Sequence, residues 1–121
     1  MRKIMVVTGS RAEYGILSGL CQLIKDHSTL DLCLAVTGTH LDEQYGSTES
    51  EILQDGFDID FRVPLSQGGD SPLDVSRAVS IGIAGFANVF DESRPDIIVV
   101  LGDRFDLLCP AIAALLAGIP L

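Results

Sequence analysis

The sequence of 121 residues is long enough for one domain of ordinary size. Hydrophobic residues make up 47% of it and charged residues 21%, a balance that excludes disordered and fibrous chains. The formal net charge of −9 opposes binding to nucleic acid or to an anionic membrane surface, so an anionic ligand would need locally placed donors.

The cysteines and the apolar stretches indicate a cytoplasmic protein. Cys21, Cys33 and Cys109 stand singly in apolar surroundings, without the spacing of a disulfide framework or a zinc knuckle. We therefore expect buried, reduced thiols. The basic N-terminus leads into a short strand rather than the apolar region of a signal peptide. The most apolar stretch, 107–121, is too short to span a membrane and contains two prolines.

The first half of the chain alternates between predicted strands and helices. Apolar runs at 4–7 and 32–36, each followed by a glycine, predict two strands. Continuous apolar runs of this length are typical of parallel strands covered on both faces. Apolar residues at three- and four-residue steps predict a helix over 14–27 and a short helix near 48–54.

The second half continues this alternation. Polar and apolar residues alternate strictly over 58–63, which predicts an edge strand with one face in water. A helix is predicted over about 73–90, a buried strand over 97–101 and a last helix over about 106–117. Because proline lacks the N–H that inner helical turns need, we expect Pro110 in or near the first turn of that helix.

Strands and helices in this order predict an α/β fold with a doubly wound parallel sheet. The expected strand order is 3-2-1-4-5, with 58–63 outermost and the start of a fifth strand at 118–121. The winding reverses between the first and the fourth strand. Ligands of such sheets bind outside the carboxyl ends of the strands at that switch point. The loops 9–13 and 102–104 are therefore expected to meet there.

The loop after the first strand has the small residues of an anion site. Gly9 and Ser10 would let the backbone approach a phosphate, toward which the next helix points its N-terminal amides. Arg11 would add a bidentate donor. The alternative is an ordinary turn in which Ser10 caps the helix, Glu13 completes a capping box and Arg11 lies in water. The spacing alone leaves both interpretations open.

Two familiar nucleotide-binding motifs are missing from this loop. The chain lacks the glycine pattern of the dinucleotide fingerprint, and its second strand ends without an acidic ribose ligand. It also lacks the Gly-Lys-Ser or Gly-Lys-Thr that ends a Walker A loop. Nicotinamide and P-loop chemistry are therefore not expected.

A second polar group follows the fourth strand, where Asp103 and Arg104 can face the same ligand as Arg11. A carboxylate beside a guanidinium suits acid or base catalysis next to a phosphate. The alternative is that Asp103 or Asp106 only caps the following helix. The loop of His40 opens toward the same crevice, although a loop histidine without a function is the commoner case. The sequence shows no metal-ligand constellation.

Three segments together resemble the hydrolysing UDP-N-acetylglucosamine 2-epimerases of sialic and legionaminic acid pathways. They are residues 8–15 (Thr-Gly-Ser-Arg-Ala-Glu-Tyr-Gly), 37–41 (Thr-Gly-Thr-His-Leu) and 101–106 (Leu-Gly-Asp-Arg-Phe-Asp). The non-hydrolysing relatives usually carry Arg-Pro-Glu in the first loop and His-Gly-Asp-Thr after the fourth strand. Ala12 and Arg104 favour the hydrolysing branch.

The resemblance implies a fold, a reaction and a set of site residues. The fold would be the Rossmann-like half of a B-type glycosyltransferase architecture. Residues 1–121 would form most of the N-terminal domain, and the C-terminal nucleotide-binding domain would lie outside this chain. The reaction would convert UDP-N-acetylglucosamine and water to N-acetylmannosamine and UDP without a cofactor. Asp103 would be catalytic, and the implied substrate-binding residues are Gly9, Ser10, Arg11, Gly15, His40 and Arg104.

The chemistry of this reaction explains the implied roles. The C2 proton has no adjacent carbonyl to acidify it, so breaking of the anomeric C–O bond must lead. Arg11 and Arg104 would stabilise the charge on the departing diphosphate. In the family further catalytic acids follow the fifth strand, so we expect the 121-residue piece alone to be inactive.

The resemblance also implies which partners the chain binds. The expected partner is a UDP-sugar, without nucleic acid or membrane, and a homo-oligomer of the full-length enzyme is left open. A domain of another B-type glycosyltransferase-like enzyme and a non-catalytic α/β binding module are the alternatives. The sequence does not choose between UDP-N-acetylglucosamine and a 2,4-diacetamido-trideoxy sugar nucleotide.

Overall fold

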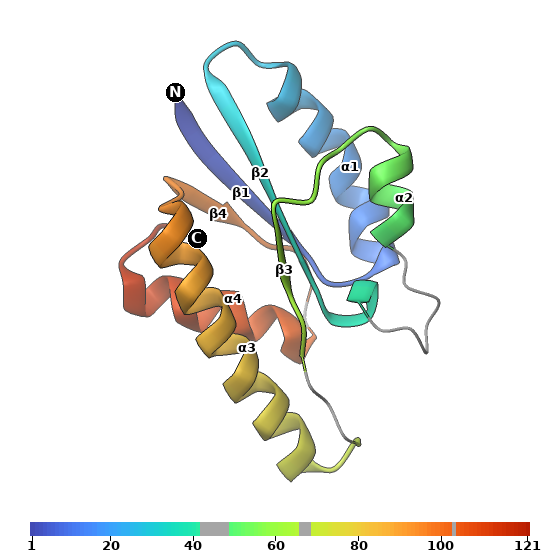
Figure 1. Ribbon diagram of the computed structural model, residues 1–121, viewed down its shortest axis with the longest axis vertical. Helices are drawn as coiled ribbons and strands as arrows, with labels where there is room; N and C mark the ends of the chain where they lie inside the picture. Colours follow the sequence, from blue (N-terminus) through green and yellow to red (C-terminus); the bar gives the residue numbers. More distant parts are fainter. Residues whose placement is uncertain (42–48, 66–68, 103) are drawn as a thin grey trace.

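The chain folds as a parallel β-sheet with helices on both faces (Figure 1). The computed structural model describes residues 1–41, 49–65, 69–102 and 104–121, without the side chains of Thr39 and His40. The strands are β1 Arg2–Thr8, β2 Leu30–Thr37, β3 Phe61–Val63 and β4 Ile97–Val99. The helices are α1 Arg11–Asp26, the 3-10 helix η1 Gly38–Leu41, α2 Glu49–Gln54, α3 Pro72–Ser93 and α4 Phe105–Ala117.

The order of the strands, β3-β2-β1-β4, confirms the doubly wound topology. All three strand pairings are parallel, and β3 lies at the edge as its alternating pattern predicted. The segment after α4 lies beside β4, because the N–H of Ile98 donates to the carbonyl of Pro120 at 2.9 Å. This is the side of β4 on which a fifth strand was expected.

The edge strand β3 is shorter than the predicted strand over 58–63. The N–H of Asp60 donates to the carbonyl of Leu34 at 2.9 Å, as a strand neighbour would. The carboxylate of Asp60, however, accepts the N–H of Leu34 at 2.8 Å. A side chain thus takes the place of the backbone carbonyl that a regular ladder would supply, and strand pairing begins only at Phe61.

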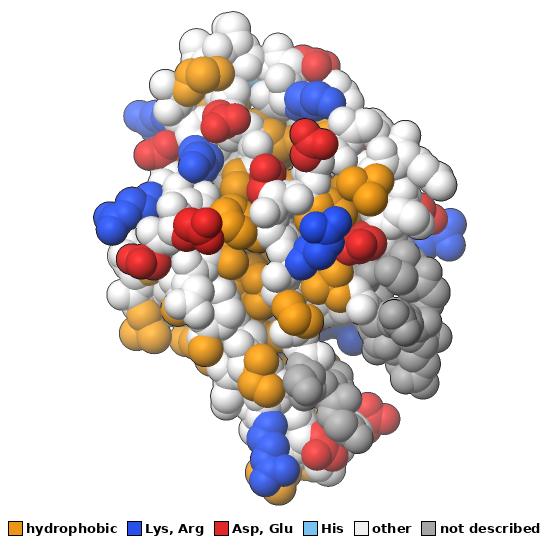
Figure 2. All heavy atoms as spheres, viewed as in Figure 1, with side chains coloured by type: hydrophobic (Ala, Val, Ile, Leu, Met, Phe, Trp, Pro, Cys, Tyr) orange, Lys and Arg blue, Asp and Glu red, His pale blue; other side chains and the backbone are white. Residues whose placement is uncertain are grey.

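Two apolar clusters lie on opposite faces of the sheet. In β1 the side chains of Met5 and Val7 belong to the cluster under α3 and α4, whereas Val6 belongs to the cluster under α1 and α2. This alternation confirms that the central strands are covered on both faces. On the face shown in Figure 2, apolar side chains run along the middle and charged ones surround them. The three thiols are buried and free, as expected.

The helix α4 carries a proline at the start of its second turn, near the first turn as the sequence predicted. Pro110 is buried there, and its ring nitrogen cannot donate to the carbonyl of Asp106 four residues earlier. The helix ends, as predicted, at Gly118, whose φ of 72° is left-handed. The first turn of α4 is therefore held less tightly by its own backbone than a regular helix would be.

By length and composition alone, α3 is the one helix within the described ranges that could cross a membrane. Core helices of soluble proteins pass the same test. In this structure Ala78, Phe86 and Phe90 of α3 are buried, and the two phenylalanines belong to the cluster that covers the sheet.

Candidate functional site

The loops after β1, β2 and β4 meet at the carboxyl end of the sheet, as the topology predicted. A Cβ atom added to Gly9 would lie 2.6 Å from Oδ2 of Asp106, and one added to Gly38 would also collide with that oxygen. A Cβ atom added to Gly102 would lie 3.0 Å from Oε1 of Glu13. Three glycines thus leave room for two carboxyl groups at the switch point.

Glu13 is the buried carboxylate of the first loop. Its Oε2 accepts the N–H of Gly9 at 2.9 Å, and its own N–H donates to Oγ of Ser10 at 3.4 Å. The pattern is a capping box shifted by one residue, because the glutamate accepts from the residue before the cap. Burial raises the pKa of Glu13, and the hydrogen bond from Gly9 opposes this. The N–H of Gly9, in the turn whose backbone was expected to approach a phosphate, is therefore bonded within the loop.

Arg11 lies on the outer side of the same loop. Its Nε is 2.9 Å from Oε1 of Glu51 in α2, and its side chain is 72% exposed. Exposed ion pairs of this kind contribute only about 0–1 kcal/mol, so a ligand could displace Glu51. Gly15 follows four residues later, on the same face of α1, and is also exposed. Their contact with a substrate stays a prediction.

Asp106 is the most deeply buried acid of the described chain, with 1% of its surface exposed. Neither carboxylate oxygen accepts a hydrogen bond of regular geometry among the described residues, although the backbone N–H groups of Asp106 and Leu107 lie close enough to oppose the rise in its pKa. The nearest cation is Arg104, whose Nε lies 3.5 Å from Oδ1. The cap residue of α4 is Arg104, whose own side chain makes no capping hydrogen bond, and Asp106 lies inside the helix. The interpretation of Asp106 as a helix cap is therefore wrong.

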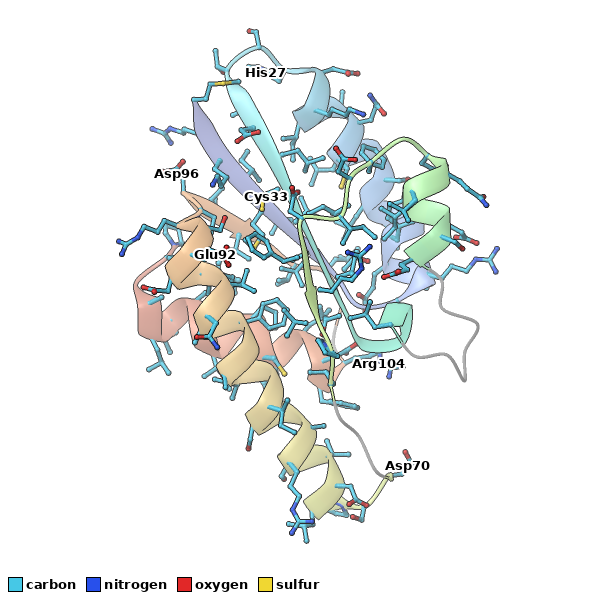
Figure 3. All side chains as sticks on the ribbon, viewed as in Figure 1. His27, Cys33, Asp70, Glu92, Asp96 and Arg104 are labelled. Atoms are coloured by element: carbon cyan, nitrogen blue, oxygen red, sulfur yellow. The ribbon has the colours of Figure 1, made fainter. Side chains whose placement is uncertain are left out.

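Arg104 lies at the open side of this cluster. Its side chain is half exposed, and its guanidinium lies 5.9 Å from the centre of the Phe105 ring. Figure 3 shows Arg104 at the same end of the sheet as η1, with Asp96 at the opposite end. A half-exposed guanidinium backed by a buried carboxylate can bind an anion that enters from solvent.

Two predicted site residues lie partly or wholly outside the part of the chain that the structure describes. The backbone of His40 lies in η1, two residues after Gly38, but its side chain is outside the described residues. Asp103 lies outside them altogether. Within the described ranges, no three His, Cys, Asp or Glu side chains lie close enough to hold a metal ion.

The burial of Glu13 and Asp106 was not predicted from the sequence. Acids in the first turn of a helix are usually exposed to water and interact favourably with the helix dipole. The positions of Glu13 and Asp106 in their helices therefore gave no sign of burial. One signal was available. Asp106 stands between Phe105 and Leu107 in an otherwise apolar helix, and an acid in such a setting is a candidate for a buried role.

Burial raises the pKa of Asp106, and the Arg104 guanidinium opposes the shift only in part. A raised pKa in the folded state means that stability is lost as the pH rises through that pKa. The variant Asp106→Asn, which cannot ionise, is therefore expected to be more stable than the wild type at pH 7. The gain should shrink as the pH falls toward about 4, where an unfolded aspartate itself becomes protonated. Urea unfolding of the wild type and of Asp106→Asn over this pH range measures the gain in stability. A gain that does not depend on pH would contradict the burial of a charge.

A separate apolar groove of about 440 Å³ lies at the other end of the strands. It runs between the C-terminal halves of α3 and α4, with Phe90, Leu116 and Ile119 in its wall. Its polar side chains are Asp91 and Arg94. Because it lies away from the switch point, it is not the candidate site.

The comparisons with known proteins identify the family of the chain. The family model described as UDP-N-acetylglucosamine 2-epimerase matches residues 22–121. The hydrolysing UDP-N,N'-diacetylbacillosamine 2-epimerase of Legionella pneumophila is 38% identical over 120 residues, which is 99% of this chain and 32% of the relative. The polysialic acid biosynthesis protein P7 of Escherichia coli is 40% identical over 121 residues, which is 100% of this chain and 31% of the relative.

A solved structure agrees on the fold. The UDP-GlcNAc 2-epimerase from Neisseria meningitidis bound to UDP-GlcNAc superimposes with a TM-score of 0.79 at 18% identity. The match covers 98% of this chain and 30% of that one, and at this identity it shows the fold alone. The chain spans about a third of the length of the curated relatives it matches. The loop 8–15 precedes the family match but lies within the match to protein P7.

Proposed function

Because the chain belongs to the UDP-N-acetylglucosamine 2-epimerase family, we propose that it is the N-terminal part of a hydrolysing UDP-sugar 2-epimerase. The observation that carries the proposal is the convergence of three loops at the switch point, where Arg104 is half exposed beside the buried Asp106. Two relatives that match 99% of the chain at 38% and 35% identity are named as hydrolysing 2-epimerases. The substrate in this proposal is a sugar linked to a nucleoside diphosphate.

The proposed reaction begins with cleavage of the bond between the anomeric carbon and the diphosphate. Negative charge then accumulates on the leaving diphosphate, and Arg104 stabilises it by charge-assisted hydrogen bonds. Loss of the C2 proton gives a glycal, and addition of water in the opposite sense inverts C2. Asp103, next to Arg104 in the sequence, is proposed as an acid or base in this exchange.

The remaining predicted residues complete the proposed substrate contacts. Gly9 and Ser10 would face the substrate through the loop after β1, and His40 through the loop after β2. Arg11 would join them after leaving Glu51, with Gly15 behind it on α1. No cofactor is needed, because elimination and hydration involve no oxidation.

The names of the relatives also narrow the choice of sugar in the proposed substrate. Two of them act on diacetylbacillosamine nucleotides, and a third is a polysialic acid biosynthesis protein. We therefore propose a role in sialic, legionaminic or a related nonulosonic acid pathway. The cytoplasmic location expected from the composition belongs to the same proposal.

The full-length protein is expected to release UDP from UDP-N-acetylglucosamine or from UDP-N,N'-diacetylbacillosamine. A coupled assay for UDP measures the release, and NMR identifies the free sugar and its configuration at C2. The 121-residue piece, which spans about a third of its relatives, is expected to release none. UDP release by that piece alone would contradict the second expectation. Sugar transfer to an acceptor, without free sugar, would favour a B-type glycosyltransferase instead.

A further inference from the structure

The buried carboxyl group of Asp106 is not explained by stability. It is almost fully enclosed, accepts no hydrogen bond of regular geometry within the described ranges, and lies 3.5 Å from its one nearby cation there. The weak contacts with nearby backbone N–H groups and with Arg104 do not cancel the effect of burial on its pKa. Removing a carboxylate from water costs several kcal/mol, which only close and well-bonded partners recover. An amide or an apolar side chain of similar size would cost the fold less. A buried polar group of this kind calls for a functional explanation.

The surroundings of Asp106 fix its position. Oδ2 occupies the space that a Cβ atom on Gly9 or Gly38 would fill, so the carboxyl group lies between the loop after β1 and η1. Its own backbone belongs to the first turn of α4. Three parts of the chain that are distant in sequence therefore hold this negative charge in one place.

Among the described residues, three charged or titratable groups interact with Asp106. Two interact with it as acids, Glu13 from α1 and Cys109 from the next turn of α4. One interacts as a cation, Arg104. Nε of Arg104 faces Oδ1 of Asp106, while half of the arginine side chain remains exposed. Contact through Nε leaves the two terminal nitrogens of a guanidinium for a bidentate contact with phosphate.

We propose that Asp106 is a positioning residue: its fixed carboxylate aims the Arg104 guanidinium into the crevice, toward the diphosphate of the substrate. This inference rests on the proposed function. Asp106 acts through Arg104 and has no contact of its own with the reacting atoms. The fold keeps a destabilising buried charge because that charge orders a half-exposed arginine that would otherwise sample many rotamers.

A double-mutant cycle in the full-length protein tests this role. The variants are Asp106→Asn, Arg104→Ala and the two combined, and the readout is kcat/KM for UDP release from the UDP-sugar. Asp106→Asn is expected to lower kcat/KM about tenfold, which corresponds to about 1.4 kcal/mol of transition-state stabilisation. Once Arg104 is alanine, the same change should have almost no further effect, because the group that Asp106 positions is gone.

The matched control is Asp91→Asn, which removes the same charge from an exposed site on α3 and should leave kcat/KM unchanged. Thermal unfolding of each variant separates a positioning role from a structural one. If Asp106 positions Arg104, the Asp106→Asn variant will be less active than the wild type, while its fold will be as stable or more stable.

Two results would overturn the inference while the proposed function stands. Asp106→Asn could retain wild-type kcat/KM, or it could lower kcat/KM equally with and without Arg104. If the wild-type protein releases no UDP from either sugar nucleotide, the proposed function fails and this inference fails with it.

Discussion

Replacing Gly38 with alanine is expected to lower the free energy of unfolding by about 3–5 kcal/mol, the sum of backbone strain and overpacking. The φ of Gly38 is 62°, a left-handed conformation that alanine adopts only with strain. Its new Cβ would collide with Oδ2 of Asp106 and would lie 2.7 Å from the carbonyl oxygen of Gly9. A backbone oxygen cannot turn away as a side chain can. Urea unfolding measures the loss.

The chain offers a matched control for this change. Gly19 lies in α1, and a Cβ atom added there would meet nothing within 4 Å. Gly19→Ala is therefore expected to stabilise the protein by about 0.5–1 kcal/mol, the usual gain of alanine over glycine inside a helix. Equal stability of the wild type and Gly38→Ala would mean that the loops after β1 and β2 do not meet as described.

Replacing Asp103 with asparagine is expected to lower kcat for UDP release by about 10²- to 10⁴-fold in the full-length protein. Asparagine keeps the size of the side chain but cannot give or take the proton that the proposed reaction moves. Initial rates at saturating UDP-sugar measure the loss, and circular dichroism checks that the fold is retained.

The result of that substitution also separates the alternatives. In a non-catalytic α/β module the side chain of Asp103 would serve the loop before α4, and Asp103→Asn would leave turnover unchanged. Asp91→Asn is again the control, because it removes an exposed carboxylate on α3 without affecting the switch point. A loss of turnover with unfolding would favour a structural role instead.

The sheet could be predicted because its signals are local. The apolar run of β1 shows that both faces are covered, and the alternation near β3 shows that one of its faces is wet. The right-handed crossover rule reduces the possible strand orders to a few, and the alternating pattern of 58–63 favours the order with that strand at the edge. The start of β3 could not be predicted, because the side chain of Asp60 replaces a backbone acceptor for Leu34, and hydropathy does not encode that contact.

The site was predicted less completely, because its contacts join distant segments. Gly9 and Gly102 were correctly expected at one place, since topology alone brings the strand ends together. The pairing of Arg11 with Glu51 depends on how α1 and α2 pack, which their separate patterns do not specify. The burial of Asp106 likewise arises only when the loops of Gly9 and Gly38 close over the first turn of α4.

The hydrogen bonds of the first loop lower the entropy cost that ligand binding there would carry. Glu13 and Ser10 already hold the turn in shape through the N–H groups of Gly9 and Glu13. A loop that is ordered before the ligand arrives loses little conformational freedom on binding, and each side chain that must be immobilised later costs about 0.5–1.5 kcal/mol. The turn after β1 is thus pre-organised. In the proposed complex, the entropy cost of ordering side chains therefore falls mainly on two cations beside the turn, the exposed Arg11 and the half-exposed Arg104.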